Sequence, residues 1–373
     1  MTTTTNPQPA GGLGPAERLA ALLRDMPDPT AAGGNARRLE EQLAAAFRSR
    51  YAVAVSSGTA ALHTALAGYG IGPGDEVLVP GATVVMTVAA VLMTGATPVL
   101  VDSTPGLDLD FDDLAAKTTT RSRAIIPVHL AGRPCDLTRL AEFAAGAGLR
   151  VIEDACQAQG SRLDGRLLGT FGDAGCFSLK DGKIAWSGEG GYIVTDDGDF
   201  AARARSFATH GFLPAPGRPA GSRLGHNYRL AEPLAVIASA NLERFDDLLE
   251  QRRQQTLLLT RLVADAPGLQ TVQPGPREQW NHYGPLFRLT LARPRDFCRR
   301  LADLGVANST GTYGLTTADR LPALADHRLP PCPTARQNCD VTLAVVVHGG
   351  HSDEQLRAMA RTINEEAHRW PTT

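Results

Sequence analysis

The chain has 373 residues, of which 43% are hydrophobic and 20% charged, and its formal net charge is -2. This length suits a large α/β domain with a smaller second domain, and a charge so close to zero argues against the basic face of a nucleic-acid-binding protein. No uninterrupted run of about 18 apolar residues is present, so no membrane-spanning helix is expected.

The first residues and the cysteines bear on cellular location. Residues 1–15 are polar, rich in Gly and Pro, and lack the apolar segment of a signal peptide, so we predict a disordered tail. The chain is too large to need a disulfide framework and has no C-x-x-C pair, which favours reduced thiols and a cytoplasmic protein. Cys332 and Cys339 share one segment but lack the histidine spacing of zinc sites, and no metal site is predicted. The six cysteines are at positions 135, 156, 176, 298, 332 and 339.

From about residue 50, apolar β-branched stretches alternate with helical ones. This order predicts an α/β fold with a mostly parallel sheet that helices cover on both faces. The expected strands are 50–58, 75–81, 97–103, 123–132, 150–155, 175–179 and 190–196. The expected helices are 59–70, 83–96, 111–118, 136–149, one near 198–208 and one long helix over 231–258.

Beyond about residue 260 strands and helices follow in an order typical of a small α+β domain. Strands are expected in 269–274, 283–292 and 342–350, and helices in 295–306 and 352–370. We therefore divide the chain into a tail and arm (1–34), a large α/β domain (35–258) and a small C-terminal α+β domain (259–373).

Lysine is scarce in this chain. Of the 37 basic residues only three are lysines, at positions 117, 180 and 183, which leaves 34 arginines. Arginine stays protonated, whereas a lysine amine can lose its proton and attack a carbonyl carbon. Lys180 and Lys183 in "FSLKDGKIAWSGEGG" therefore suggest a site that needs an amine, although two solvated lysines in a Lys-Asp-Gly turn remain the alternative.

A turn of small residues, "SSGTAAL" (56–62), joins a predicted strand to a predicted helix. Free N–H groups at a helix start form a phosphate site. Ser and Thr are also ordinary helix N-caps, so both interpretations stay open.

Asp154 ends the buried strand in "RVIEDACQAQG". Ligands of parallel α/β sheets bind at the carboxyl ends of strands, and a carboxylate there is costly unless it meets a cation. A protonated pyridine nitrogen would supply the cation; an arginine ion pair or a helix N-cap would also explain the residue.

The three segments together favour pyridoxal 5'-phosphate as cofactor. The helix start would hold the phosphate, Asp154 the ring nitrogen, and a lysine the cofactor aldehyde. Ser178, at another predicted strand end, lies five residues before Lys183.

The chain resembles the DegT/StrS family of fold-type I pyridoxal-phosphate sugar and cyclitol aminotransferases, within the aspartate aminotransferase superfamily, from about residue 35 onward. The resemblance rests on "SSGTAALHTAL", "GDEVLVPGATVVMTVAAVLMTGATPVLVD", "IIPVHLAGRPCDL", "VIEDACQAQGS", "GDAGCFSLKDGKIAWSGEGG" and "LGHNYRLAEPLA". It implies a mostly parallel seven-stranded sheet and a homodimer with shared active sites.

The resemblance also assigns roles to individual residues. Lys183, rather than Lys180, would bond to the cofactor, because it follows the "FS" serine by five residues. Asp154 would pair with the pyridine nitrogen, and Gln157 would lie near the ring's phenolic oxygen.

Phosphate and donor contacts are implied for further residues. Gly58, Thr59 and Ser178 would hold the phosphate, and Asn227 would reach the phosphate of the neighbouring subunit's cofactor. Arg229 has two open interpretations, a contact with the amino donor's carboxylate or a structural ion pair.

Two departures from the family pattern bear on the substrate. Val84 stands where family members usually carry an aromatic residue that stacks on the cofactor, so what covers the ring face is open. The segment "LKDGK" lacks the common histidine and looks more like the aminohydroxybenzoate-synthase and cyclitol branches than the nucleotide-sugar ones.

The function implied is transfer of an amino group from glutamate or glutamine to a keto-cyclitol or keto-sugar, nucleotide-linked or not, as in antibiotic-type secondary metabolism. Another pyridoxal reaction, such as elimination or racemisation, is the alternative. A dehydrogenase lacks its G-x-G-x-x-G motif here, and a catalytically silent relative would have lost Lys183 or Asp154.

Several histidines and one tyrosine receive no site assignment. His129 is expected to be packed within the sheet. His282 and Tyr283 begin a predicted strand that would face the active-site cleft, and His348 and His351 fit either that cleft or a surface turn.

Overall fold

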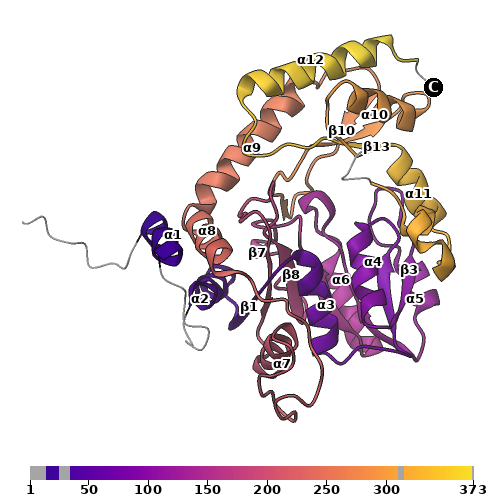
Figure 1. Ribbon diagram of the computed structural model, residues 1–373. Coiled ribbons are helices and arrows are strands. Elements are labelled where there is room, and N and C mark those ends of the chain that lie inside the picture. Colours follow the sequence, from indigo (N-terminus) through magenta and orange to yellow (C-terminus); the bar gives the residue numbers. More distant parts are fainter. Residues whose placement is uncertain (1–13, 25–33, 310–314, 372–373) are drawn as a thin grey trace, which may run out of the picture.

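The computed structural model describes residues 14–24, 34–309 and 315–371. Its centre is a sheet of seven strands in the spatial order β1-β9-β8-β5-β4-β2-β3 (Figure 1). The strands are β1 (Tyr51–Val55), β2 (Glu76–Pro80), β3 (Thr97–Val101), β4 (Ser122–Ile125), β5 (Arg150–Asp154), β8 (Ala174–Ser178) and β9 (Gly191–Thr195).

The sheet is mostly parallel, as the alternating pattern predicted. Only β9 runs against its neighbours, since it pairs antiparallel with both β1 and β8. All other neighbouring strands of this sheet pair in parallel. The short apolar runs of β2 and β8 fit this arrangement, because strands buried on both faces need not alternate. The prediction of an α/β fold with a mostly parallel seven-stranded sheet is confirmed.

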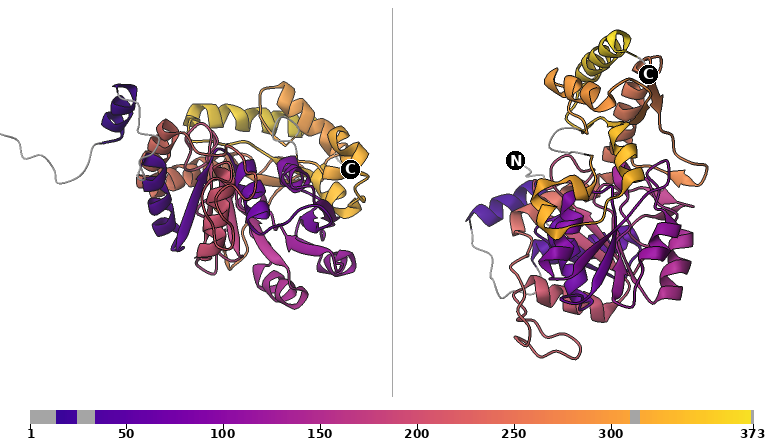
Figure 2. Two further views of the ribbon diagram at one scale, coloured as in Figure 1. Left: turned by 60° about the horizontal axis from the view of Figure 1, so that its bottom comes forward. Right: turned by 90° about the vertical axis from the view of Figure 1, so that its right-hand side faces the viewer.

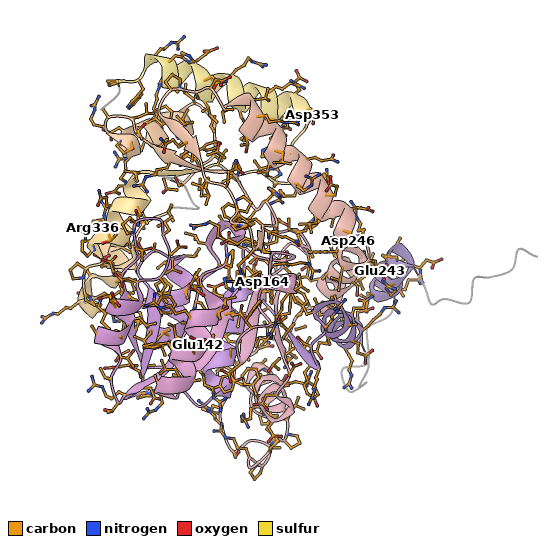
Figure 3. All side chains as sticks on the ribbon, turned by 180° about the vertical axis from the view of Figure 1, so that it is seen from behind. Glu142, Asp164, Glu243, Asp246, Arg336 and Asp353 are labelled. Carbon is orange, nitrogen blue, oxygen red and sulfur yellow. The ribbon has the colours of Figure 1, made fainter. Side chains whose placement is uncertain are left out.

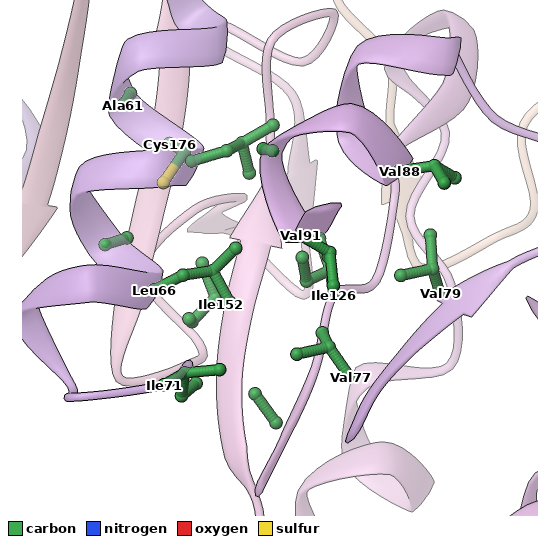
Figure 4. Close-up of a cluster of buried hydrophobic side chains, with 14 of the residues drawn as sticks. Ala61, Leu66, Ile71, Val77, Val79, Val88, Val91, Ile126, Ile152 and Cys176 are labelled. Atoms are coloured by element: carbon green, nitrogen blue, oxygen red, sulfur yellow. The ribbon is translucent and has the colours of Figure 1, made fainter. Parts of the chain in front are cut away.

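Helices cover both faces of the sheet and form two hydrophobic cores. On one face lie α3 (Gly58–Gly68), α4 (Val85–Met93) and α7 (Gly198–Ala208). Figure 4 shows Leu66 of α3 and Val91 of α4 facing Val77 and Ile152 of the strands. On the other face lie α2 (Asn35–Phe47), α5 (Phe111–Lys117), α6 (Leu137–Ala147) and α8 (Glu232–Glu243).

Several predicted elements are shorter than expected; the strand predicted over 342–350, for example, ends at Ala344. The long helix over 231–258 is divided into α8 and α9 (Phe245–Leu262), because Arg244 between them has φ -114° and ψ 25°. Two aspartates in the first turn of α9 favour this new start, since carboxylates stabilise helix N-termini. Figure 3 labels Glu243 and Asp246 on the two sides of the break.

The strand expected over 123–132 stops at Ile125. Pro127 has no backbone N–H for the ladder, and after an isolated bridge between Val128 and Asp154 the chain forms a short 3-10 helix over Leu130–Gly132. The turn brings this segment against the end of β5.

The C-terminal region contains a three-stranded antiparallel sheet of β10 (Leu269–Thr271), β12 (Leu286–Leu289) and β13 (Thr342–Ala344). Its strands, α9, α10 (Pro294–Asp303) and α12 (Asp353–Arg369) surround a third core. Figures 1 and 2 show this region stacked on one end of the large sheet, with α9 running from α8 to α12.

Two parts of the chain beyond residue 259 return to the large α/β region. Residues 315–339 contribute Leu315, Ala318 and Cys332 to the core of α3 and α4; this stretch holds the 3-10 turns Ala318–Arg320 and Pro322–His327, and α11 is Pro333–Asp340. Strand β11 (Glu278–Gln279) pairs with β6 (Arg162–Leu163), which pairs with β7 (Arg166–Leu167). The division at residues 258 and 259 stays a prediction; α9 runs across it.

The remaining described helix is α1 (Pro15–Arg24), and the disordered tail predicted for residues 1–15 falls almost entirely outside the described residues. Within the described ranges, no helix combines the length and apolar character needed to cross a membrane. The same ranges hold no group of three or more His, Cys, Asp or Glu side chains arranged to bind a metal ion.

Candidate active site

Lys183 lies in the loop between β8 and β9, at the carboxyl edge of the large sheet. Its side chain is half-buried, whereas Lys180 is exposed. The Nζ atom of Lys183 donates a hydrogen bond to the Tyr283 hydroxyl at 3.1 Å and lies 4.7 Å from the centre of that ring. The two lysines therefore differ in burial, and the amine of Lys183 meets the Tyr283 hydroxyl from a segment distant in the chain.

Gln159 holds the two ends of the lysine loop. This side chain is 1% exposed. Its Nε2 donates to the carbonyls of Ser178 (3.1 Å) and Ala185 (3.2 Å), and its Oε1 accepts from the Ala185 N–H (3.0 Å). Since the backbone partners lie on either side of Lys183, one buried amide restricts where the lysine can be.

Arg252 of α9 contacts the same loop from the other side. It is buried and donates to the Gly182 carbonyl at 3.0 Å and to the Tyr283 carbonyl at 3.2 Å. No carboxylate among the described residues pairs with it, and burial lowers the pKa of its guanidinium to about 10. The group stays cationic at neutral pH, so it adds positive charge beside Lys183.

Asp154 ends β5 and is 6% exposed. Its Oδ2 accepts from the Thr87 hydroxyl (2.8 Å) and its Oδ1 from the Cys156 N–H (3.2 Å). Thr87 in turn shares a hydrogen bond of 2.8 Å with Thr83. Within the described ranges no Lys, Arg or His forms an ion pair with Asp154, and the residue caps no helix, so neither structural alternative accounts for this carboxylate.

The turn at the start of α3 lies against the end of β8. Ser57 is the N-cap, accepting from the Ala60 N–H at 3.0 Å. A Cβ atom added to Gly58 would lie 2.8 Å from Cys156 Sγ and 3.0 Å from Ser178 Cβ, so only glycine allows this approach. The N–H groups of the first helical residues, Gly58 and Thr59, have no acceptor within the helix, and Gly58 itself lies against Ser178.

Gln157 and Cys156 complete this edge of the sheet. Gln157 Oε1 accepts from the Ala131 N–H at 2.7 Å, which orients the amide and leaves its NH2 group to donate elsewhere. Burial, followed by the nearby Asp154 charge, raises the pKa of Cys156 well above its usual value, while Lys183 lowers it. The thiol therefore stays protonated at neutral pH.

Within the described part of the chain no hydrogen bond joins the Asn227 side chain to another predicted site residue, although the adjacent Tyr228 carbonyl accepts from the Ser56 N–H at 2.8 Å. Asn227 is exposed and pairs through its backbone with Thr209. Arg229 is also exposed; its guanidinium lies 3.4 Å from His210 Nδ1, with no carboxylate partner among the described residues. Because Asn227 was predicted to act on a neighbouring subunit, its role stays a prediction.

The histidines have mainly structural surroundings. His129 is fully buried and its Nε2 lies 2.8 Å from Glu153 Oε2, as expected of a packed residue. Glu153 also accepts N–H groups from the segment after β7. His348 and His351 stack on each other in a turn, with ring centres 3.8 Å apart.

Sequence reasoning missed several residues that support the site, namely Thr87, Gln159, Arg252 and Asn281. All are buried polar side chains. The only signal in the sequence is a polar residue within an otherwise apolar segment, as for Thr87 in "VVMTVAAVL". Arg252 sits among several polar residues of α9, and nothing there distinguishes it.

Comparisons with known proteins identify relatives of this chain. The model of the DegT/DnrJ/EryC1/StrS aminotransferase family matches residues 18–364. The chain is 33% identical over 349 residues to the UDP-N-acetyl-3-dehydro-alpha-D-glucosamine 3-aminotransferase of Acidithiobacillus ferrooxidans, covering 90% of this chain and 89% of that one. It is 38% identical over 223 residues to GDP-perosamine synthase of Escherichia coli O157:H7, but this match spans only 60% of the chain and 61% of the relative.

A solved structure gives the same result for the fold. The structure of DesV from S. venezuelae superposes with a TM-score of 0.82 at 30% identity, covering 95% of this chain and 94% of that one.

Proposed function

The chain belongs to the DegT/DnrJ/EryC1/StrS aminotransferase family and is therefore an enzyme of the aminotransferase class with the fold of the fold-type I enzymes. From this premise we propose that it binds pyridoxal 5'-phosphate and transfers an amino group from glutamate or glutamine to a keto-sugar, in particular a nucleotide-linked one. A keto-cyclitol is the other acceptor class we propose.

The observation that carries the proposal is the pair formed by Asp154 and Lys183 at one edge of the sheet. Asp154 is a buried carboxylate without a cationic partner among the described residues. Such a charge is costly, and a protonated pyridine nitrogen would compensate it. Lys183 supplies the amine that bonds to the cofactor aldehyde. The residues present thus fit this cofactor.

The phosphate fits the start of α3. Its N–H groups at Gly58 and Thr59 and the positive end of the helix dipole favour an anion. Ser178 packs against Gly58 at this helix start, which supports a role for its hydroxyl at the same anion site. We therefore propose that Gly58, Thr59 and Ser178 hold the phosphate.

Of the other residues, Gln157 would orient the cofactor ring and Lys183 would move protons. When bound, the cofactor supplies an aldehyde for the amino group and a ring that withdraws electrons. Gln157, whose Oε1 is engaged by Ala131, keeps its NH2 group to donate to the ring's phenolic oxygen. The amine of Lys183, once free, would take a proton from the donor's α-carbon as a general base and deliver it as a general acid to the cofactor carbon that carries the amino group.

The proposals for the acceptor and for the assembly rest on the names of relatives and on exposed residues. The names of the two relatives contain UDP- and GDP-linked amino sugars, which favours a nucleotide-linked keto-sugar. Val84 begins α4 as its N-cap and is 41% exposed, so a ligand or a second chain can cover it. We propose a cytoplasmic homodimer in which Asn227 reaches the neighbouring site, because this exposed side chain forms no hydrogen bond to another candidate residue among the described ones.

The proposal is tested on the purified protein with added pyridoxal 5'-phosphate. We expect a visible absorption band, and borohydride treatment should then attach the cofactor to a peptide containing Lys183. Lys183→Arg keeps the charge but cannot form the bond, so it should give no trapped peptide.

Adding glutamate should bleach the band and release one equivalent of 2-oxoglutarate. Failure of the wild-type protein to bind the cofactor would contradict the proposal. Racemised glutamate without 2-oxoglutarate would instead support the alternative pyridoxal chemistry.

A further inference from the structure

Tyr283 is the only described residue recorded to hydrogen-bond the Lys183 amine. The Nζ–Oη distance is 3.1 Å, and the amine also lies near the ring face, 4.7 Å from its centre. Tyr283 belongs to the segment before β12, which lies 100 positions after Lys183 in the chain. The contact therefore depends on how this segment is held.

The backbone around Tyr283 is fixed by side chains from two directions. Its N–H donates to Asn281 Oδ1 (3.0 Å), and its carbonyl accepts from Arg252 (3.2 Å). Thr256 of α9 donates to the His282 carbonyl (3.0 Å). His282 has a positive φ of 53°, a conformation that costs free energy for a non-glycine residue and persists only when its surroundings enforce it.

Asn281 connects this segment to the loop that follows Asp154. It is 1% exposed, and its Nδ2 donates to the carbonyls of Gln157 and Gln159, each at 2.9 Å. Its N–H donates to Ser161 Oγ at 3.0 Å. Asn281 packs so tightly against Gly132 that a Cβ atom on Gly132 would lie 2.2 Å from Asn281 Oδ1. The tyrosine and the proposed ring-binding residues therefore share one rigid support.

The hydrogen bonds that hold the backbone at residues 282 and 283 are more than an aromatic residue needs if it only fills space. Such a residue requires apolar contacts, whereas here the backbone is held so that the hydroxyl meets the amine. Preorganised hydrogen-bonding groups of this type are what a proton-transfer site requires.

We propose that Tyr283 is a further catalytic residue whose hydroxyl orients the Lys183 amine during proton transfer. The inference rests on the proposed aminotransferase function. When the amine is protonated, Nζ–H donates to the tyrosine oxygen; when it is neutral, the tyrosine O–H donates to the nitrogen lone pair. Tyr283 keeps its own proton in both arrangements, so lysine alone gains and loses the transferred proton.

The test compares Tyr283→Phe with Tyr69→Phe. Both remove one hydroxyl from a partly buried tyrosine, but the Tyr69 hydroxyl donates to the Asp173 carbonyl at 3.2 Å and its ring stacks on Phe200 in the core of α3. Each variant is loaded with cofactor, trapped with borohydride at Lys183, and mixed with glutamate in a single turnover.

For Tyr283→Phe we expect unchanged cofactor binding and trapping, and a single-turnover rate roughly 10- to 100-fold lower, at the small end of general acid–base effects. The isotope effect with α-deuterated glutamate should increase, because proton transfer becomes more rate-limiting. Tyr69→Phe should leave both quantities at the wild-type values.

An unchanged rate in Tyr283→Phe would overturn the inference while the proposed function stands. Loss of cofactor binding in this variant would also overturn it, because the hydroxyl would then be structural. If the wild-type protein itself binds no cofactor, the proposed function fails, and the inference fails with it.

Discussion

The two proposed reactive groups lie at the same edge of the sheet but are supported differently. Asp154 is held by groups of the large α/β region, namely the Thr87 hydroxyl of α4 and the Cys156 N–H of its own loop. Lys183 is held partly by that region, through Gln159, and partly by α9 and the segment before β12, through Arg252 and Tyr283.

This difference matches the roles proposed for the two groups. A residue that stabilises a fixed charge needs a constant position and a dry environment, which a strand end within one core provides. A residue that moves a proton has to be oriented toward a substrate, and its support here comes from the junction between two cores. The comparison predicts that changes beside Asp154 affect cofactor electronics and affinity, whereas changes beside Lys183 affect rate and the stability of the junction.

The largest effect is expected from Asp154→Asn. The amide cannot keep the ring nitrogen protonated, so the glutamate half-reaction should slow by about 100-fold, which corresponds to about 2.7 kcal/mol. The unfolding midpoint without cofactor should not fall, since a costly buried charge is removed. Single-turnover absorbance and thermal unfolding measure the two quantities.

The matched control for this variant is Asp164→Asn, which removes an exposed carboxylate paired with Arg277. Its half-reaction rate should equal the wild-type rate. A wild-type half-reaction rate in Asp154→Asn would mean that Asp154 does not stabilise the ring charge, and the proposed difference between Asp154 and Lys183 would then fail.

The next effect is expected from Arg252→Met, on the lysine side. The carbonyls of Gly182 and Tyr283 would lose their donor, and burying carbonyls without a partner should lower the free energy of unfolding by about 2 kcal/mol. Urea unfolding of the protein without cofactor measures this change.

Arg253→Met serves as the control, because the neighbouring Arg253 is exposed and pairs with the exposed Glu250. This variant should leave the urea midpoint near the wild-type value. Equal midpoints for the two variants would show that Arg252 does not hold the junction.

The smallest effect is expected from Thr87→Val, which keeps the shape but removes the hydroxyl that Asp154 accepts from. Loss of one hydrogen bond of this kind, about 1 kcal/mol, should weaken cofactor affinity about fivefold without changing the half-reaction rate much. An absorbance titration with cofactor measures the affinity.

Thr94→Val, at the other end of the same helix, removes a hydroxyl that donates to the Val91 carbonyl at 2.7 Å. It should leave cofactor affinity unchanged. Equal affinities in both variants would mean that Thr87 does not position Asp154.

Local patterns predicted the large sheet well, because β-branched runs and helical periodicity are properties of short segments. The same patterns predicted that Asp154 and Ser178 would lie at strand ends, and the structure shows that the two strands are neighbours. They failed at Arg244, where one apolar periodicity continues through two helices, and at Pro127, where an apolar run continues after the ladder has ended.

The supports of the site lay beyond such patterns. Tyr283 reaches Lys183 only because Asn281, Arg252 and the positive-φ His282 fold its segment back onto the large sheet. No short-range periodicity encodes a contact over that separation in the chain.

The amino-acid sequence by itself determined the class of fold and the reactive groups available, because the alternation of strands and helices, the scarce lysines and a carboxylate at a strand end can be read directly from the order of residues. Only the tertiary structure decided that Asp154 has no counter-charge among the described residues and that Tyr283 meets Lys183. Burial and hydrogen-bond partners belong to the packed chain, since they arise when segments far apart in the sequence exclude water from one another.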